Sequence, residues 1–127
     1  MFNYNNKIFR PVVNSENGET SNETVFNYKQ TGNILTSEYS GGKIKNGHLI
    51  GLVDEKGNID MRYHQINIEG EIMTGICKSK PEILENGKIR LHESWEWRSG
   101  DKSKGQSIIE EQSECQPLSA VTQDTRI

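Results

Sequence analysis

The clearest alternating pattern in this chain is Lys88-Ile-Arg-Leu-His-Glu-Ser-Trp-Glu-Trp-Arg98. Its side chains divide into two sets when they are counted in steps of two. One set is apolar except for a single carboxylate, and it consists of Ile89, Leu91, Glu93, Trp95 and Trp97. The other set is polar, and it consists of Arg90, His92, Ser94, Glu96 and Arg98. Because successive side chains of a strand point to opposite faces, the stretch predicts a β-strand with one buried face.

Glu93 is the charged residue on the apolar face of this strand. Burying a carboxylate costs free energy unless the group is paired or hydrogen-bonded. A carboxylate in a row with two tryptophans therefore indicates either an internal hydrogen-bond network or a binding site.

The rest of the chain has the composition of one small domain with a thin core. Its 127 residues predict a single domain. The hydrophobic content of 31% is low, but the apolar residues alternate and glycine-containing turns separate them, which favours a small β-structure over disorder. The net charge is −3 without a long basic run, so the composition does not favour a nucleic-acid partner.

Targeting and cofactor motifs give no positive signal. The first ten residues lack the apolar core of a signal peptide, and no apolar run is long enough for a transmembrane helix. We therefore expect a cytoplasmic protein without a membrane partner, in which Cys77 and Cys115 are free thiols. The sequence predicts no cofactor and no metal site, because it contains no phosphate-binding loop and no clustered metal ligands.

Eight alternating runs separated by turn residues predict eight strands and no helix longer than a turn or two. The runs cover residues 7–13, 23–30, 34–40, 43–53, 59–67, 71–79, 88–98 and 106–112. Short links between successive strands predict antiparallel neighbours. An up-and-down barrel leaves no sheet edge exposed, and about eight strands is the size that holds one small ligand.

We therefore predict an all-β, antiparallel up-and-down barrel of calycin type, similar in plan to avidins and lipocalins. The barrel domain covers residues 1–112, of which residues 1–6 are expected to be frayed. Residues 113–127 show no periodicity and predict a flexible tail. A two-sheet sandwich is the alternative fold, although it more often needs long crossing connections.

Several polar and aromatic side chains are carried into the barrel if its apolar faces point inward. The residues predicted to line an interior ligand site are Glu93, Trp95, Trp97, Tyr63, Gln65, His48, Asn46 and Tyr28. Phe26 and Thr74 fall on the same predicted faces. Aromatic walls with a few convergent polar groups are typical of small-molecule sites.

Three functions are compatible with this interior. The first is binding of a small polar or aromatic molecule, with Glu93 accepting a hydrogen bond. The second is an enzyme in which Glu93 or His48 acts as acid or base. The third is a structural module that binds nothing, since small barrels can fill their interior with hydrogen-bonded polar side chains. Such a module can form a homo-oligomer through apolar residues on the predicted outer face, namely Leu49, Val53 and Ile66.

Five short segments carry a resemblance to a known group of proteins. They are NSENGE (14–19), YSGGKI (39–44), GHLIGLVD (47–54), MRYHQ (61–65) and LHESWEW (91–97). Together they resemble small bacterial proteins of about this length that are named hypothetical proteins or N-acetylglutamate synthases. The resemblance covers roughly residues 3–112 and assigns no catalytic residue. The usual acetyltransferase fold is mixed α/β with a pyrophosphate-binding loop, and this sequence predicts neither feature.

Overall fold

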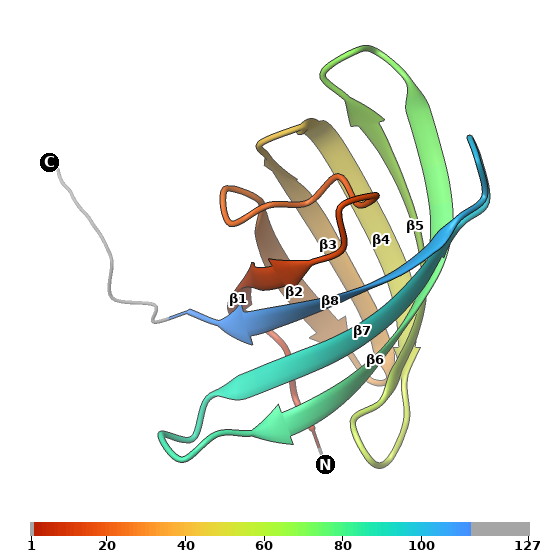
Figure 1. Cartoon of the computed structure of the whole chain (residues 1–127). Helices are drawn as coiled ribbons and strands as arrows, with labels where there is room; N and C mark the ends of the chain where they lie inside the picture. The colour runs from red at the N-terminus through yellow and green to blue at the C-terminus, as the bar shows by residue number, and fades with distance from the viewer. Residues whose placement is uncertain (1, 113–127) are drawn as a thin grey trace, which may run out of the picture.

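The computed structural model describes residues 2–112, and these form a closed antiparallel barrel of eight strands (Figure 1). The strands are β1 (Lys7–Asn14), β2 (Val25–Thr31), β3 (Ile34–Gly41), β4 (Ile44–Val53), β5 (Ile59–Asn67), β6 (Ile72–Ile83), β7 (Ile89–Trp97) and β8 (Lys104–Glu111). Each strand pairs with its neighbour in the chain, and β1 pairs with β8 to close the barrel. The predicted up-and-down barrel is confirmed, and the sandwich alternative is wrong. The predicted tail and Cys115 lie outside the described residues.

The faces of β7 are those that its sequence predicts. Leu91 and Trp97 are buried inside the barrel, whereas His92 and Ser94 are exposed on its outer wall. The predicted inward faces of β2 and β5 are confirmed in the same way. In these strands most apolar side chains occupy one face, with Val25 of β2 and Ile66 of β5 as exceptions, so the period of two still identifies the inward face.

Most of β4 faces the opposite way from the prediction. Ile44 points inward as expected, but the pairing of β4 with β5 shifts register between Ile44 and Asn46. Such a bulge adds one residue to a strand and exchanges the two faces beyond it. Asn46 and His48 therefore lie on the outer wall, so the prediction that they line the interior is wrong.

The same bulge turns Leu49 and Val53 into the core, where they are 2% and 7% exposed. They therefore cannot form the outer apolar face that the oligomer hypothesis used. Ile66 is exposed as predicted.

Two glycines on the inward face of β4 explain why the sequence pattern did not reveal which face points inward. Gly47 and Gly51 occupy inward positions of β4, and large side chains of the neighbouring strands fill the space above them. A Cβ on Gly47 would lie 2.3 Å from the Tyr39 ring, and one on Gly51 would lie 2.8 Å from the Cβ of Met61. The glycines thus mark close approach, which is one of the two meanings of glycine within a strand.

The faces of β6 are also exchanged relative to the prediction. Thr74 lies on the outer side, whereas Gly75, Cys77 and Ser79 are buried inside. The inward glycine leaves room for Tyr63, whose hydroxyl would lie 2.3 Å from a Cβ at that position. Because the apolar residues of β6 occur on both faces, periodicity alone selects the wrong one.

β6 also continues beyond its predicted end, through Pro81 to Ile83. The β5–β6 pairing ends at Ser79, so the strand beyond it pairs only with β7. Proline is tolerated there because no neighbour on the other side needs its missing N–H.

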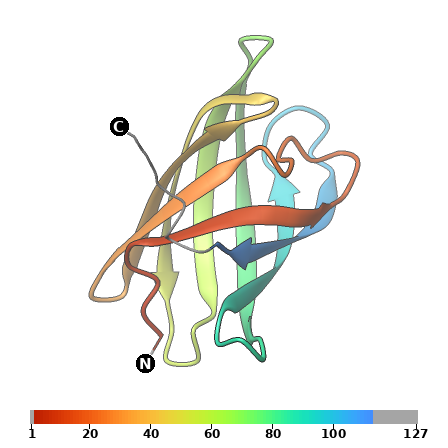
Figure 2. The same cartoon turned by 90° about the vertical axis from the view of Figure 1, so that its left-hand side faces the viewer.

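The N-terminal segment closes one end of the barrel instead of fraying. Tyr4 is completely buried, and its Oη donates a hydrogen bond of 2.6 Å to the backbone oxygen of Gly57. Its backbone N–H donates to Oε1 of Gln30 over 2.9 Å. The prediction of a frayed start is wrong because the aromatic ring of Tyr4 packs against Phe9 and Tyr28. In Figure 2 the N-terminal segment lies at the lower end, and the β1–β2 connection lies toward the other end.

Candidate functional site

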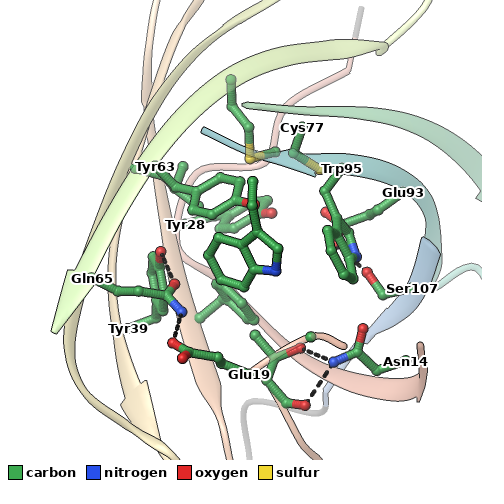
Figure 3. A pocket seen from close by; sticks show the side chains of 16 residues that line it. Asn14, Glu19, Tyr28, Tyr39, Tyr63, Gln65, Cys77, Glu93, Trp95 and Ser107 are labelled. Carbon is green, nitrogen blue, oxygen red and sulfur yellow. Dashed lines mark hydrogen bonds between the residues drawn. The ribbon is translucent and has the colours of Figure 1, made fainter. Parts of the chain in front are cut away.

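A cavity lies inside the barrel, and six aromatic side chains contribute to its wall (Figure 3). The aromatic members are Phe26, Tyr28, Tyr39, Tyr63, Trp95 and Trp97. The centre of a water molecule can occupy about 60 Å³ of this space.

Six of the eight residues predicted to line an interior site surround this cavity. They are Glu93, Trp95, Trp97, Tyr63, Gln65 and Tyr28. Asn46 and His48 lie on the outer wall, where the ring of His48 stands 5.4 Å from that of His64. The placement of the six residues follows the sequence, and their role in binding a ligand stays a prediction.

Glu93 sits at the centre of a row of three side chains from neighbouring strands. The strand register places it opposite Ser79 of β6 and opposite Ser107 of β8. Ser79 Oγ donates to Glu93 Oε2 over 2.9 Å, and Ser107 Oγ donates to Oε1 over 3.1 Å. Both carboxylate oxygens are therefore anchored by hydroxyl groups, and not by a cation.

Burial raises the pKa of Glu93 to about 7, and the two serine hydroxyls only partly oppose this shift. The side chain keeps some solvent-accessible surface because it borders the cavity, while protein atoms enclose the rest. Its carboxyl group is thus poised to change protonation near neutral pH, as a general acid or base requires.

Two buried polar atoms beside this cavity have no hydrogen-bond partner within residues 2–112. They are the hydroxyl oxygen of Tyr28 and Oδ1 of Asn14. Leaving such an atom unsatisfied costs about 1–3 kcal/mol, and native structures contain few of them. The pKa of Tyr28 is raised well above its usual value by burial and by Glu93, so the hydroxyl keeps its proton.

The connection between β1 and β2 covers the cavity. Glu19 of this connection accepts hydrogen bonds from Gln65 Nε2 over 2.8 Å and from Asn67 Nδ2 over 2.9 Å. Gln65 Oε1 in turn accepts a hydrogen bond of 2.8 Å from the Tyr39 hydroxyl. The carboxylate of Glu19 thus ties the connection to the inner face of β5 (Figure 3).

A second attachment holds the same connection to β7 and β8. Trp97 Nε1 donates to the backbone oxygen of Asn17 over 3.0 Å. Asn17 Nδ2 donates to Ser103 Oγ and to the Lys104 oxygen, each over 2.9 Å. The β1–β2 connection is therefore hydrogen-bonded to β5 on one side and to β7 and β8 on the other, and it covers the cavity.

Besides Thr20, sequence reasoning missed five polar or reactive residues at this site. They are Asn14, Glu19, Cys77, Ser79 and Ser107. Cys77 and Ser79 were missed because the prediction exchanged the faces of β6. Asn14 and Glu19 were missed because they belong to a polar stretch without periodicity. The thiol of Cys77 is buried, and burial raises its pKa well above the usual value, so the group is not a reactive thiolate.

Two further findings concern metal ions and membrane-spanning helices in the part of the chain that the structure covers. Within residues 2–112, no group of three or more potential metal-binding side chains is placed to hold an ion. No helix in the same range is long and apolar enough to span a membrane.

Comparison with known proteins gives one match. A family model described as avidin-like protein matches residues 2–112. No curated protein matches the chain, and no solved structure matches it. The match supports the barrel plan, and it carries neither the N-acetylglutamate synthase name nor a bacterial origin.

Proposed function

The chain belongs to the avidin-like protein family, and we propose that it binds a small polar molecule inside its barrel. The observation that carries this proposal is the pair of unsatisfied buried atoms, Tyr28 Oη and Asn14 Oδ1, on the wall of one cavity. An interior that served only as packing would be expected to satisfy its own polar groups. A bound molecule with hydrogen-bonding groups would remove the cost of leaving both atoms unpaired.

The size of the cavity limits the ligand. A free volume of about 60 Å³ is well below the several hundred Å³ typical of sites for drug-sized molecules. A ligand that fits without rearrangement is therefore compact, with only a few heavy atoms inside the barrel. A larger ligand requires the β1–β2 connection to release Glu19 and move away from the cavity.

The two tryptophans of the chain provide a direct measurement of binding. Both Trp95 and Trp97 line the cavity, so the tryptophan fluorescence of the protein responds to changes in this space. Native and denatured masses of freshly purified protein would first show whether a molecule is retained. Candidate ligands would then be titrated, with biotin among them because streptavidin, a barrel of this size, binds it.

A matched pair of variants separates binding from stability. Tyr28→Phe keeps the ring and removes the unsatisfied hydroxyl, and we expect it to weaken binding by about tenfold or more. Tyr4→Phe makes the same chemical change at the closed end of the barrel, and we expect it to leave the affinity nearly unchanged. Equal affinities of wild type and Tyr28→Phe would contradict the assigned site. No retained mass and no fluorescence response to any ligand would contradict interior binding.

An enzyme using the same cavity is the second candidate, and the raised pKa of Glu93 favours it. The other predicted acid or base, His48, lies on the outer wall and has no place in this reaction. A bound compound should then be converted over time, as followed by mass spectrometry, and Glu93→Gln should abolish the conversion while the compound still binds. A ligand that stays chemically unchanged would leave binding as the function.

A further inference from the structure

We propose that the ligand of this cavity is a small organic cation of the ammonium or guanidinium class. The inference rests on the interior binding proposed above, and it adds the charge and the hydrogen-bonding character of the ligand. Three independent features of the wall support it: its formal charges, its free hydrogen-bond acceptors and its aromatic rings.

The formal charges on the wall are negative. Glu93 and Glu19 line the cavity, and no Lys, Arg or His lines it. Among the ion pairs within the described range, none includes either carboxylate. Buried carboxylates are normally paired, and an isolated one is costly. A cation inside the cavity would supply the missing partner, whereas an anionic ligand would be repelled.

The hydrogen-bond donors of the wall are only partly used within the protein, since the hydroxyl of Tyr28 has no partner among the described residues. Five lining side chains already donate to protein acceptors, namely Asn14, Tyr39, Gln65, Trp97 and Ser107. Acceptors remain available, because each Glu93 oxygen accepts one serine hydroxyl and a carboxylate has about four acceptor positions in all. Asn14 Oδ1 is a further free acceptor on the described wall. A ligand rich in N–H groups complements this surface.

The aromatic rings add attraction for a positive charge. Trp95 and Trp97 lie edge to face with ring centroids 5.7 Å apart, and Tyr63 lies 5.6 Å from Trp97. The negative face of an aromatic ring attracts ammonium and guanidinium groups, most strongly in a desolvated site.

These rings are held in position by the strands behind them. A Cβ on Gly105 would lie 2.3 Å from the Trp95 ring, and one on Gly75 would lie equally close to the Tyr63 hydroxyl. The rings therefore lie directly against bare backbone. An aromatic cage that is arranged in advance binds its ligand at a lower entropic cost.

The test compares methylguanidinium chloride with methylurea, which have the same shape and differ in charge. Both would be titrated at millimolar concentrations, at constant ionic strength and at pH 8, with tryptophan fluorescence as the readout. We expect methylguanidinium to bind at least about tenfold more tightly than methylurea, in line with a desolvated cation–π contact and a charge-assisted hydrogen bond. Glu93→Gln, which keeps the side-chain shape, should bring the two affinities to within about threefold of each other.

Two controls keep the result interpretable. Thermal unfolding would establish that Glu93→Gln folds, and Glu19→Gln would provide a second variant that removes the other carboxylate from the wall. Tighter or equal binding of methylurea by the wild type would overturn the cation class while leaving interior binding in place. A preference for methylguanidinium that both variants retain would also overturn it. If neither compound changes the fluorescence, the cation proposal fails, and the retained-mass experiment decides separately whether the interior binds anything.

Discussion

Tyr4 and Tyr28 differ in one respect that separates the two ends of the barrel. Both are completely buried, and their rings lie 6.2 Å apart and edge to face. The hydroxyl of Tyr4 donates to Gly57, whereas that of Tyr28 has no partner among the described residues. The hydroxyl of Tyr4 is thus satisfied by the structure itself, whereas that of the neighbouring Tyr28 is left unpaired within residues 2–112. We expect Tyr4 to contribute to stability and Tyr28 to contribute to the binding that we propose.

Replacing Tyr4, which closes one end of the barrel, should have the largest effect on stability. Tyr4→Ala deletes a buried aromatic ring and its hydrogen bond, so we expect the free energy of unfolding to fall by about 3–5 kcal/mol. Urea denaturation would measure this change. Asn3→Ala in the same segment is the control, because Asn3 is exposed, and it should change stability by less than about 0.5 kcal/mol. Equal, small effects of both variants would show that the segment does not close the barrel.

Glu93, which lines the cavity, should instead make the free energy of unfolding depend on pH. The pKa of Glu93 rises from 4.5 to about 7 on folding, so the folded protein binds this proton more tightly than the unfolded chain does. This contribution to stability is fully present below about pH 4.5 and is lost as the pH rises through about 7. It amounts to at most about 3 kcal/mol.

Glu93→Gln cannot lose that proton, so its stability should change less between pH 5 and pH 8 than that of the wild type. Unfolding in urea at a series of pH values would compare them. Parallel pH profiles would mean that Glu93 is not isolated from water in the folded protein.

Two variants that each remove one hydroxyl oxygen, Tyr4→Phe and Tyr28→Phe, compare the two tyrosines with the smallest chemical change. Tyr4→Phe leaves the Gly57 carbonyl without its donor and should destabilise the protein by about 1–2 kcal/mol. Tyr28→Phe removes an atom that is already unpaired, so the ligand-free protein should be equally stable or slightly more stable. Chemical denaturation of protein freed of ligand would measure both. A larger loss for Tyr28→Phe would show that its hydroxyl has a structural partner.

Substitutions on the outer wall should have the smallest effect. His48→Ala changes a side chain that the interior-face prediction had placed in the site, but the structure places it outside. We expect a change in stability within about 0.5 kcal/mol and no change in ligand affinity. Fluorescence titration beside Tyr28→Phe would check this. A loss of affinity would show that the outer wall contributes to ligand binding.

The sequence predicts the barrel and much of the site because strands such as β7 are apolar on one face only. The prediction fails in segments that are not apolar on one face only. In β4 a bulge and two inward glycines moved Asn46 and His48 to the outer wall, and neither feature alters the count of apolar residues. The cover carrying Glu19 has no periodicity, so its contacts depend on the folded barrel and could not be derived from local pattern.

The pairing of β1 with β8 has a consequence for how the protein is made. These strands are the first and the last within residues 2–112, and only their pairing closes the wall. A nascent chain on the ribosome cannot complete the barrel until β8 has emerged, and contacts between such distant segments form slowly. Until then β1 and β7 present open edges that can pair with other chains. We therefore expect chaperone protection during synthesis to matter more for this protein than its small size suggests.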